Sequence, residues 1–124
     1  AAAIADFRPA EISEQKIKKR KGSTNLKLEN THDFLIDLGK GKRPEQTIVG
    51  FAAETEHLEE NALEKLERKH LDLIVANDVS HPGVGFSYDT NEVTIMSQDS
   101  KWTLPLSDKR IIADGILDAL LEVR

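Results

Sequence analysis

An acidic residue and a basic cluster stand ten residues apart near the start of the chain. Asp6 follows a run of small apolar residues, and five of the six residues 16–21 are Lys or Arg. A carboxylate at the end of a strand can accept hydrogen bonds from sugar hydroxyls or base amines, and ammonium groups can neutralise phosphate charge during transfer. These residues predict half of a nucleotide site, with Asp6, Lys16, Lys18 and Lys19 as candidates. A solvated basic turn is the alternative interpretation.

A strand-to-helix junction made of small residues is the second candidate. Residues 50–55 read Gly-Phe-Ala-Ala-Glu-Thr, and the backbone N–H groups at a helix N-terminus attract anions. Gly50 permits a close backbone approach, and the ring of Phe51 can stack on a base. A tightly packed turn with Phe51 in the core is the alternative, and the residues alone favour it. Lys65 and Lys69 lie four residues apart on the helix that follows, where periodicity alone predicts an exposed face.

The composition argues against several classes of site and partner. The chain has no Cys, which excludes disulfides, thiolate metal sites and a Cys nucleophile. Its four His residues lack metal-ligand spacing, so a zinc site is not favoured. A net charge of −5 argues against broad nucleic-acid binding. No apolar run approaches the roughly 20 residues that span a bilayer. We therefore expect neither nucleic acid nor a membrane as a partner.

Hydrophobic periodicity predicts an α/β fold that positions these residues. A buried strand is expected over residues 46–53, a helix over 56–69 and another buried strand over 71–76. This strand–helix–strand unit implies parallel strands joined by a right-handed crossover. The other expected elements are a buried strand at 1–7 that Pro9 ends, a half-exposed strand at 26–29, a helix at 33–38 capped by Asn30 or Thr31 and ended by Gly39, a hairpin of 92–97 with 102–106, and a helix at 108–123 capped by Ser107.

The length and the start of the chain bear on its domain organisation. A chain of 124 residues fits one domain or part of a larger one. It begins without Met and directly inside an expected buried strand. We therefore expect a fragment whose preceding part is absent.

Four motifs in a fixed order carry a resemblance to a known family. They read Ala-Ala-Ala-Ile-Ala-Asp-Phe-Arg-Pro, Lys-Ile-Lys-Lys, Val-Gly-Phe-Ala-Ala-Glu-Thr and Asp-Leu-Ile-Val-Ala-Asn-Asp-Val, followed by a Gly-Phe loop and a Thr-Asn-Glu-Val-Thr strand. In this order and spacing the chain resembles bacterial phosphopantothenate–cysteine ligase, the synthetase half of the bifunctional coenzyme A biosynthesis flavoprotein. The resemblance covers essentially all 124 residues.

The resemblance implies a fold, a reaction and its partners. The family is Rossmann-like, homodimeric, cytoplasmic and magnesium-dependent, so we expect a three-layer fold with a mostly parallel sheet, followed by a C-terminal hairpin and helix. Bacterial members typically use CTP: the carboxylate of 4′-phosphopantothenate attacks the α-phosphate, which gives an acyl-cytidylate and pyrophosphate. The amine of L-cysteine then displaces CMP and forms the amide. The implied partners are CTP with Mg²⁺, 4′-phosphopantothenate, L-cysteine and a second copy of the chain.

The resemblance also implies roles for individual residues. Lys16, the first Lys of Lys-Ile-Lys-Lys, would be the catalytic residue at the reacting phosphate, and residues 16–25 would form a mobile flap. The implied nucleotide contacts are the backbone at Ala2 and Ala3 and the side chains of Asp6, Lys16, Phe51, Lys65 and Lys69. Further implied site-lining residues are Thr31, His32, Asp33, Phe34, Gly50, Lys18 and Lys19.

Two departures from the family pattern bear on what the chain alone is expected to do. Many relatives carry Asn-Pro-Asp-Ile where this chain has Thr-His-Asp-Phe at residues 31–34. The family's N-terminal half is missing, so we expect about the C-terminal half of one synthetase domain, which should not complete the reaction alone. FMN is expected only if a decarboxylase domain precedes this one, and the residues do not decide between CTP and ATP. The alternative hypothesis is a non-catalytic half-domain that binds a nucleotide or another chain.

Overall fold

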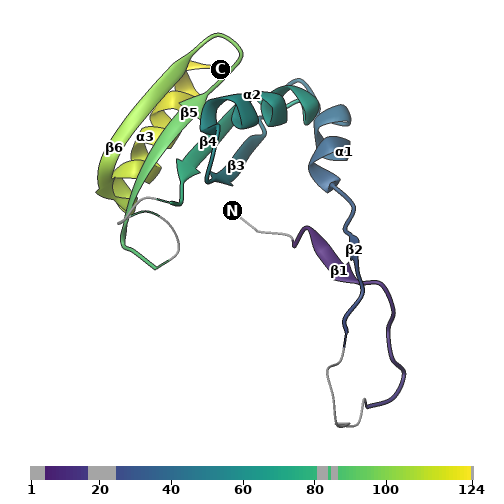
Figure 1. Cartoon of the computed structure of the whole chain (residues 1–124). Coiled ribbons are helices and arrows are strands. Elements are labelled where there is room, and N and C mark those ends of the chain that lie inside the picture. Colours follow the sequence, from purple (N-terminus) through teal and green to yellow (C-terminus); the bar gives the residue numbers. More distant parts are fainter. Residues whose placement is uncertain (1–4, 17–24, 81–83, 85–86, 124) are drawn as a thin grey trace. The chain divides into compact units, whose positions relative to one another are not determined.

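The structure is a computed structural model that describes residues 5–16, 25–80, 84 and 87–123. The chain forms two compact units, which we call unit 1 (Ala1–Phe34) and unit 2 (Leu35–Arg124). Figure 1 shows a short two-stranded ribbon in unit 1 and a sheet with helices in unit 2.

Unit 1 is built on one antiparallel ladder. Strands β1 (Phe7–Pro9) and β2 (Leu28–Asn30) pair over three residues each, and Arg8 Nε lies 2.7 Å from Glu29 Oε1 across the ladder. The prediction of a buried strand over residues 1–7 is wrong for its described part. Phe7 is 57% exposed. Among the described strands, β1 pairs with β2 alone, and every residue of β2 is exposed as well. Strand β1 ends at Pro9, as predicted.

Helix α1 (Phe34–Lys40) lies at the border of the two units and confirms the helix expected near residues 33–38. The prediction that Gly39 ends this helix is wrong, because Gly39 lies inside it and is buried. A Cβ atom at this position would lie 2.0 Å from the carbonyl oxygen of Lys69. Gly39 therefore serves a close approach to the backbone at the end of the next helix.

Unit 2 contains a four-stranded sheet in the order β3-β4-β5-β6. Strand β3 (Val49–Glu54) and strand β4 (Leu73–Asp78) are parallel and joined through α2 (Leu58–Arg68), which confirms the strand–helix–strand unit. Strand β5 (Thr90–Met96) pairs antiparallel with both β4 and β6 (Lys101–Asp108). The mostly parallel sheet that we predicted is therefore wrong for the described strands. A parallel partner needs a crossover of about a dozen residues or more, whereas only residues 79–89 lie between β4 and β5 and only residues 97–100 between β5 and β6.

The sheet of unit 2 separates two apolar cores, which confirms the predicted three-layer α/β arrangement. Side chains of β4 alternate between the faces: Ile74 packs with Ala62 and Leu66 of α2, whereas Leu73 packs with Ile112 of α3 (Lys109–Glu122). Figure 1 shows both helices beside the sheet. Burying a side chain such as Leu66 contributes roughly 2 kcal/mol. Two such cores hold the ends of β3 and β4 in place.

The start of α3 differs from the prediction by one residue. Ser107 was predicted to cap the last helix, but it lies in β6 and its hydroxyl donates to the carbonyl of Pro105. The cap is Asp108, whose Oδ1 accepts a hydrogen bond from the N–H of Arg110 at 2.8 Å. The prediction is wrong by one residue because β6 continues to Asp108.

Candidate functional site

The carboxyl ends of β3 and β4 carry the densest polar contacts near predicted site residues. Glu54 ends β3 opposite Asp78, which ends β4. One carboxylate oxygen of Glu54 accepts a hydrogen bond from Lys65 Nζ of α2, and the other accepts one from Asn61 Nδ2 at 3.0 Å. Ligands of open α/β sheets bind at the carboxyl ends of the strands, so this edge is the first candidate region.

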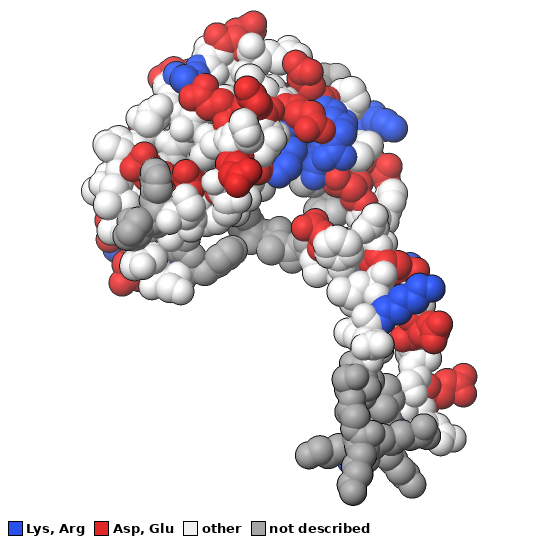
Figure 2. Space-filling model, in the orientation of Figure 1, with Lys and Arg blue, Asp and Glu red and all other residues white. Residues whose placement is uncertain are grey.

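Lys65 in the last turn of α2 and Lys69 at its C-cap are both half-buried, so the exposed face that periodicity alone predicted is wrong for them. Lys65 is fixed by its ion pair with Glu54. Figure 2 shows Lys and Arg side chains gathered over the C-terminal half of α2, beside Asp and Glu side chains. Helix α2 carries four acidic and two basic residues, so the positive charge is local to its last turn, with Lys65 and Arg68, and to Lys69 at its C-cap.

Phe51 lies on β3 and is 57% exposed. The prediction of a core position for this ring, which the residues alone favoured, is wrong. Its neighbour Ala52 packs in the core beneath α2, and neighbouring side chains of a strand point to opposite faces. Phe51 and Lys65 therefore come from opposite faces of the sheet. Phe51 lies on β3, whereas Lys65 reaches β3 through its ion pair with Glu54. Strand β3 has β4 as its one partner among the described strands.

Gly50 is buried beside Leu71 on β3. A Cβ atom added to Gly50 would lie 2.5 Å from Leu71 Cδ1. The close approach therefore comes from the side chain of Leu71 and not, as we had predicted, from a backbone segment. Gly50 is therefore part of the packing at the edge of the sheet.

Unit 1 holds the other described candidates. The carbonyl oxygen of Asp6 accepts a hydrogen bond from the N–H of Thr31 at 2.8 Å, and Thr31 Oγ1 donates to the carbonyl of Ala5. The structure thus brings Asp6 beside the segment that also holds His32 and Asp33. Thr31 does not act as the expected helix cap, because its hydroxyl serves this cross-strand contact.

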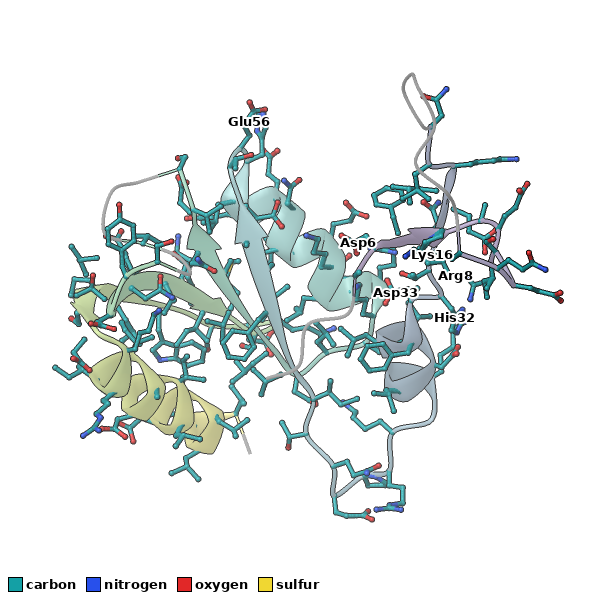
Figure 3. The ribbon with its side chains drawn as sticks, turned by 90° about the horizontal axis from the view of Figure 1, so that it is seen from below. Asp6, Arg8, Lys16, His32, Asp33 and Glu56 are labelled. Carbon is teal, nitrogen blue, oxygen red and sulfur yellow. The ribbon has the colours of Figure 1, made fainter. Side chains whose placement is uncertain are left out.

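Lys16 is exposed in unit 1. Figure 3 shows Asp6, Arg8, Lys16, His32 and Asp33 around the β1–β2 ribbon, and within unit 2 it shows Glu56 where β3 leads into α2. The predicted contacts outside the described residues are Ala2, Ala3, Lys18 and Lys19, together with most of the predicted flap at residues 16–25.

Two hollows in unit 2 are lined by other residues than the predicted contacts. One of about 190 Å³ lies beside the carboxyl end of β4 and is lined by Asp78, Glu92 and Thr94 together with apolar side chains. A larger one of about 360 Å³ is lined by residues of α1 and of the segment that leads into β3. The candidate site is therefore defined by charge and strand ends rather than by a closed cavity.

Within its described part, the chain has neither a cluster of metal ligands nor a helix that could span a membrane. No group of three or more His, Asp and Glu residues is placed to hold a metal ion within the described part of the chain. None of the described helices is long and apolar enough to cross a membrane. The described donor set therefore offers no site for a resident metal.

Sequence reasoning missed Glu54 and Asn61 as members of the site. The Glu54–Lys65 contact joins residues eleven apart across a turn, which no helical or strand periodicity encodes. The one available signal was the acidic residue at the carboxyl end of an apolar strand.

Comparisons with known proteins add three findings. The family model described as "DFP: DNA/pantothenate metabolism flavoprotein C-terminal domain" matches residues 1–123. The coenzyme A biosynthesis bifunctional protein CoaBC of Bacillus subtilis (strain 168) is 48% identical over 120 residues, which are 96% of this chain and 29% of that protein. A cysteine/cysteine sulfinic acid decarboxylase from an unknown prokaryotic organism is 45% identical over 100 residues, 81% of this chain and 28% of that protein.

A solved structure extends the comparison to the fold. The crystal structure of the C-terminal domain of coenzyme A biosynthesis bifunctional protein CoaBC superposes with a TM-score of 0.70 at 36% identity. The match covers 96% of this chain and 50% of that chain. The chain thus spans less than a third of the length of these curated relatives and half of the solved domain.

Proposed function

The chain belongs to the family of DNA/pantothenate metabolism flavoprotein C-terminal domains, and we propose that it supplies part of a Rossmann-like, nucleotide-binding synthetase domain of coenzyme A biosynthesis. The observation that carries this proposal is the family match over residues 1–123, with 48% identity to a coenzyme A biosynthesis protein. The half-buried Lys65, which Glu54 holds at the carboxyl end of β3, supports it, because a triphosphate needs fixed positive charge.

The proposed reaction joins 4′-phosphopantothenate to L-cysteine at the expense of CTP. The carboxylate of 4′-phosphopantothenate attacks the α-phosphorus of CTP, and the bond to the bridging oxygen breaks with release of pyrophosphate. The cysteine amine then attacks the acyl carbon of the acyl-cytidylate, loses a proton and expels CMP. The products are phosphopantothenoylcysteine, CMP and pyrophosphate.

The residues of this chain have charge-stabilising and positioning roles in the proposal. Lys16 stabilises the negative charge that develops at the reacting phosphate, and Lys65 and Lys69 contact the nucleotide. Asp6 accepts hydrogen bonds from it, and Phe51 lies against it. Mg²⁺ enters as the counter-ion of CTP, since magnesium is commonly held by substrate phosphates and water.

The edge position of β3 reconciles the placement of Phe51 with that of Lys65. The two side chains leave the sheet on opposite faces, but a nucleotide that crosses the edge of β3 at its carboxyl end can reach both. The proposal therefore places the base toward Phe51 and the phosphates toward α2.

The test uses the protein as its gene encodes it, supplied with CTP, Mg²⁺, 4′-phosphopantothenate and L-cysteine. We expect pyrophosphate release that requires 4′-phosphopantothenate, and a lower rate when ATP replaces CTP. Absence of pyrophosphate under these conditions would overturn the ligase proposal.

A calorimetric titration with CTP separates the second candidate function, a non-catalytic nucleotide-binding half-domain. CTP binding without pyrophosphate release would support it and contradict the ligase.

A further inference from the structure

In unit 2, Asp72 accepts hydrogen bonds at both carboxylate oxygens, from Lys42 Nζ and from the N–H of Ile48, and its side chain is 30% exposed. The carboxylate of Glu54 is also held at both oxygens and is more buried. Its side chain is 11% exposed, and both of its oxygens accept hydrogen bonds, one from Lys65 Nζ and one from Asn61 Nδ2. By contrast, the ion pair of Lys101 with Glu59 is 50% and 56% exposed, and pairs of that kind contribute little.

The backbone around Glu54 is fixed as well. Its carbonyl oxygen accepts a hydrogen bond from the N–H of Val79 at 3.0 Å, just beyond the end of β4. Asn61 Nδ2 also donates to the carbonyl of Glu56 at 2.9 Å, so one amide ties the loop after β3 to α2. The Glu54 carboxylate is thereby anchored from the strand, the loop and the helix.

This anchoring determines where the charge of Lys65 lies. A lysine has a flexible four-carbon stem and three N–H donors. The bond to Glu54 uses one donor and holds the ammonium group at the carboxyl end of β3, where ligands of α/β sheets bind. An ammonium group that is already fixed loses less rotamer entropy when an anion binds.

We propose that Glu54 is a positioning residue, which holds Lys65 in place for the phosphates of the nucleotide. The inference rests on the proposed function, because it requires that Lys65 contacts the nucleotide. Asn61 takes part by holding the second oxygen of Glu54. Neither Glu54 nor Asn61 touches the reacting atoms in this proposal.

The first test keeps every charge and changes only the geometry. Glu54→Asp shortens the acidic side chain by one methylene, and Asn61→Ala releases its second oxygen. In the complete gene product we expect each variant to raise the KM for CTP by about tenfold, with kcat within about twofold, because ordering one lysine side chain affects ground state and transition state alike. Glu59→Asp is the matched control. Glu59 lies on α2, as Asn61 does, and is the exposed ion-pair partner of Lys101, so this variant should leave the KM for CTP unchanged.

A double-mutant cycle separates positioning from a general effect on folding. In a Lys65→Met background, Glu54→Asp should raise the KM no further, because there is no ammonium group left to position. The cycle also distinguishes a failure of the Lys65 assignment from a failure of the positioning role of Glu54. If Lys65→Met leaves the KM for CTP unchanged, the assignment of Lys65 under the proposed function is wrong. If Lys65→Met raises the KM but Glu54→Asp does not, or raises it equally without the lysine, the positioning role is wrong.

Discussion

The two units of the chain differ in how they hold their candidate site residues. Unit 1 presents Asp6 and Lys16 from segments that flank a three-residue ladder in which every strand residue is exposed, and none of its described residues is buried. Unit 2 presents Phe51 and Lys65 from a sheet with an apolar core on each face. Exposed charge needs little packing, whereas a half-buried lysine needs a scaffold that fixes its partner. We therefore expect Lys16 to act through its charge alone, whereas Phe51 and Lys65 depend on the packing that holds them in place.

The largest expected effect tests whether packing is confined to unit 2. Leu66→Ala removes a side chain that is 2% exposed in the core under α2, and we expect it to lower the free energy of unfolding by about 3 kcal/mol. Leu28→Ala in β2, where the side chain is 51% exposed, should change it by less than about 0.5 kcal/mol. Urea denaturation of the gene product measures both. Equal losses would show that the ribbon has a core of its own.

The second prediction concerns the exposed charge of unit 1. Lys16→Gln should lower kcat/KM for pyrophosphate release by about 100-fold, because it removes a charge that stabilises the transition state. Its thermal midpoint should not change, since Lys16 is exposed. Lys27→Gln, an exposed lysine of the same unit, is the control and should retain activity. An unchanged rate in Lys16→Gln would show that the assignment of Lys16 is wrong.

The third prediction concerns Phe51, the exposed aromatic residue on the edge strand β3. Phe51→Ala should raise the KM for CTP by about tenfold, the loss expected for one ring stacked on a base. Its cost in stability should stay below about 1 kcal/mol, because the ring is 57% exposed. Phe51→Tyr keeps the stacking surface and should restore the KM. A large loss of stability with an unchanged KM would instead identify Phe51 as a packing residue.

The sequence predicted local and periodic features of unit 2 well. The strand–helix–strand unit, the apolar stripe of α2 and the β5–β6 hairpin each follow from a period of 3.6 or 2 or from a short turn. Strand direction beyond the first crossover was not encoded locally, so the antiparallel pairing of β4 with β5 was missed. The exposure of Phe7 was missed for a related reason, since burial depends on which distant strands pair.

The candidate site was predictable by resemblance and only partly by physics. Charge and strand ends pointed to Asp6 and Lys16, but no period or spacing placed Lys65 on Glu54. That contact depends on how α2 packs over the end of β3, which only the assembled core determines. Glu54 and Asn61 were consequently absent from the predicted site.

The smallest expected effect concerns backbone strain at the end of α2. His70 follows this helix with φ at 52°, in the left-handed region that costs a residue with a Cβ roughly 1 kcal/mol. We expect His70→Gly to raise the free energy of unfolding by about 1 kcal/mol, which corresponds to a thermal midpoint about 4–8 °C higher in a unit of this size. A less stable variant would mean that the His70 side chain contributes more by packing near Gly39 than its backbone conformation costs. In that case the end of α2 would be part of the scaffold that positions the lysines.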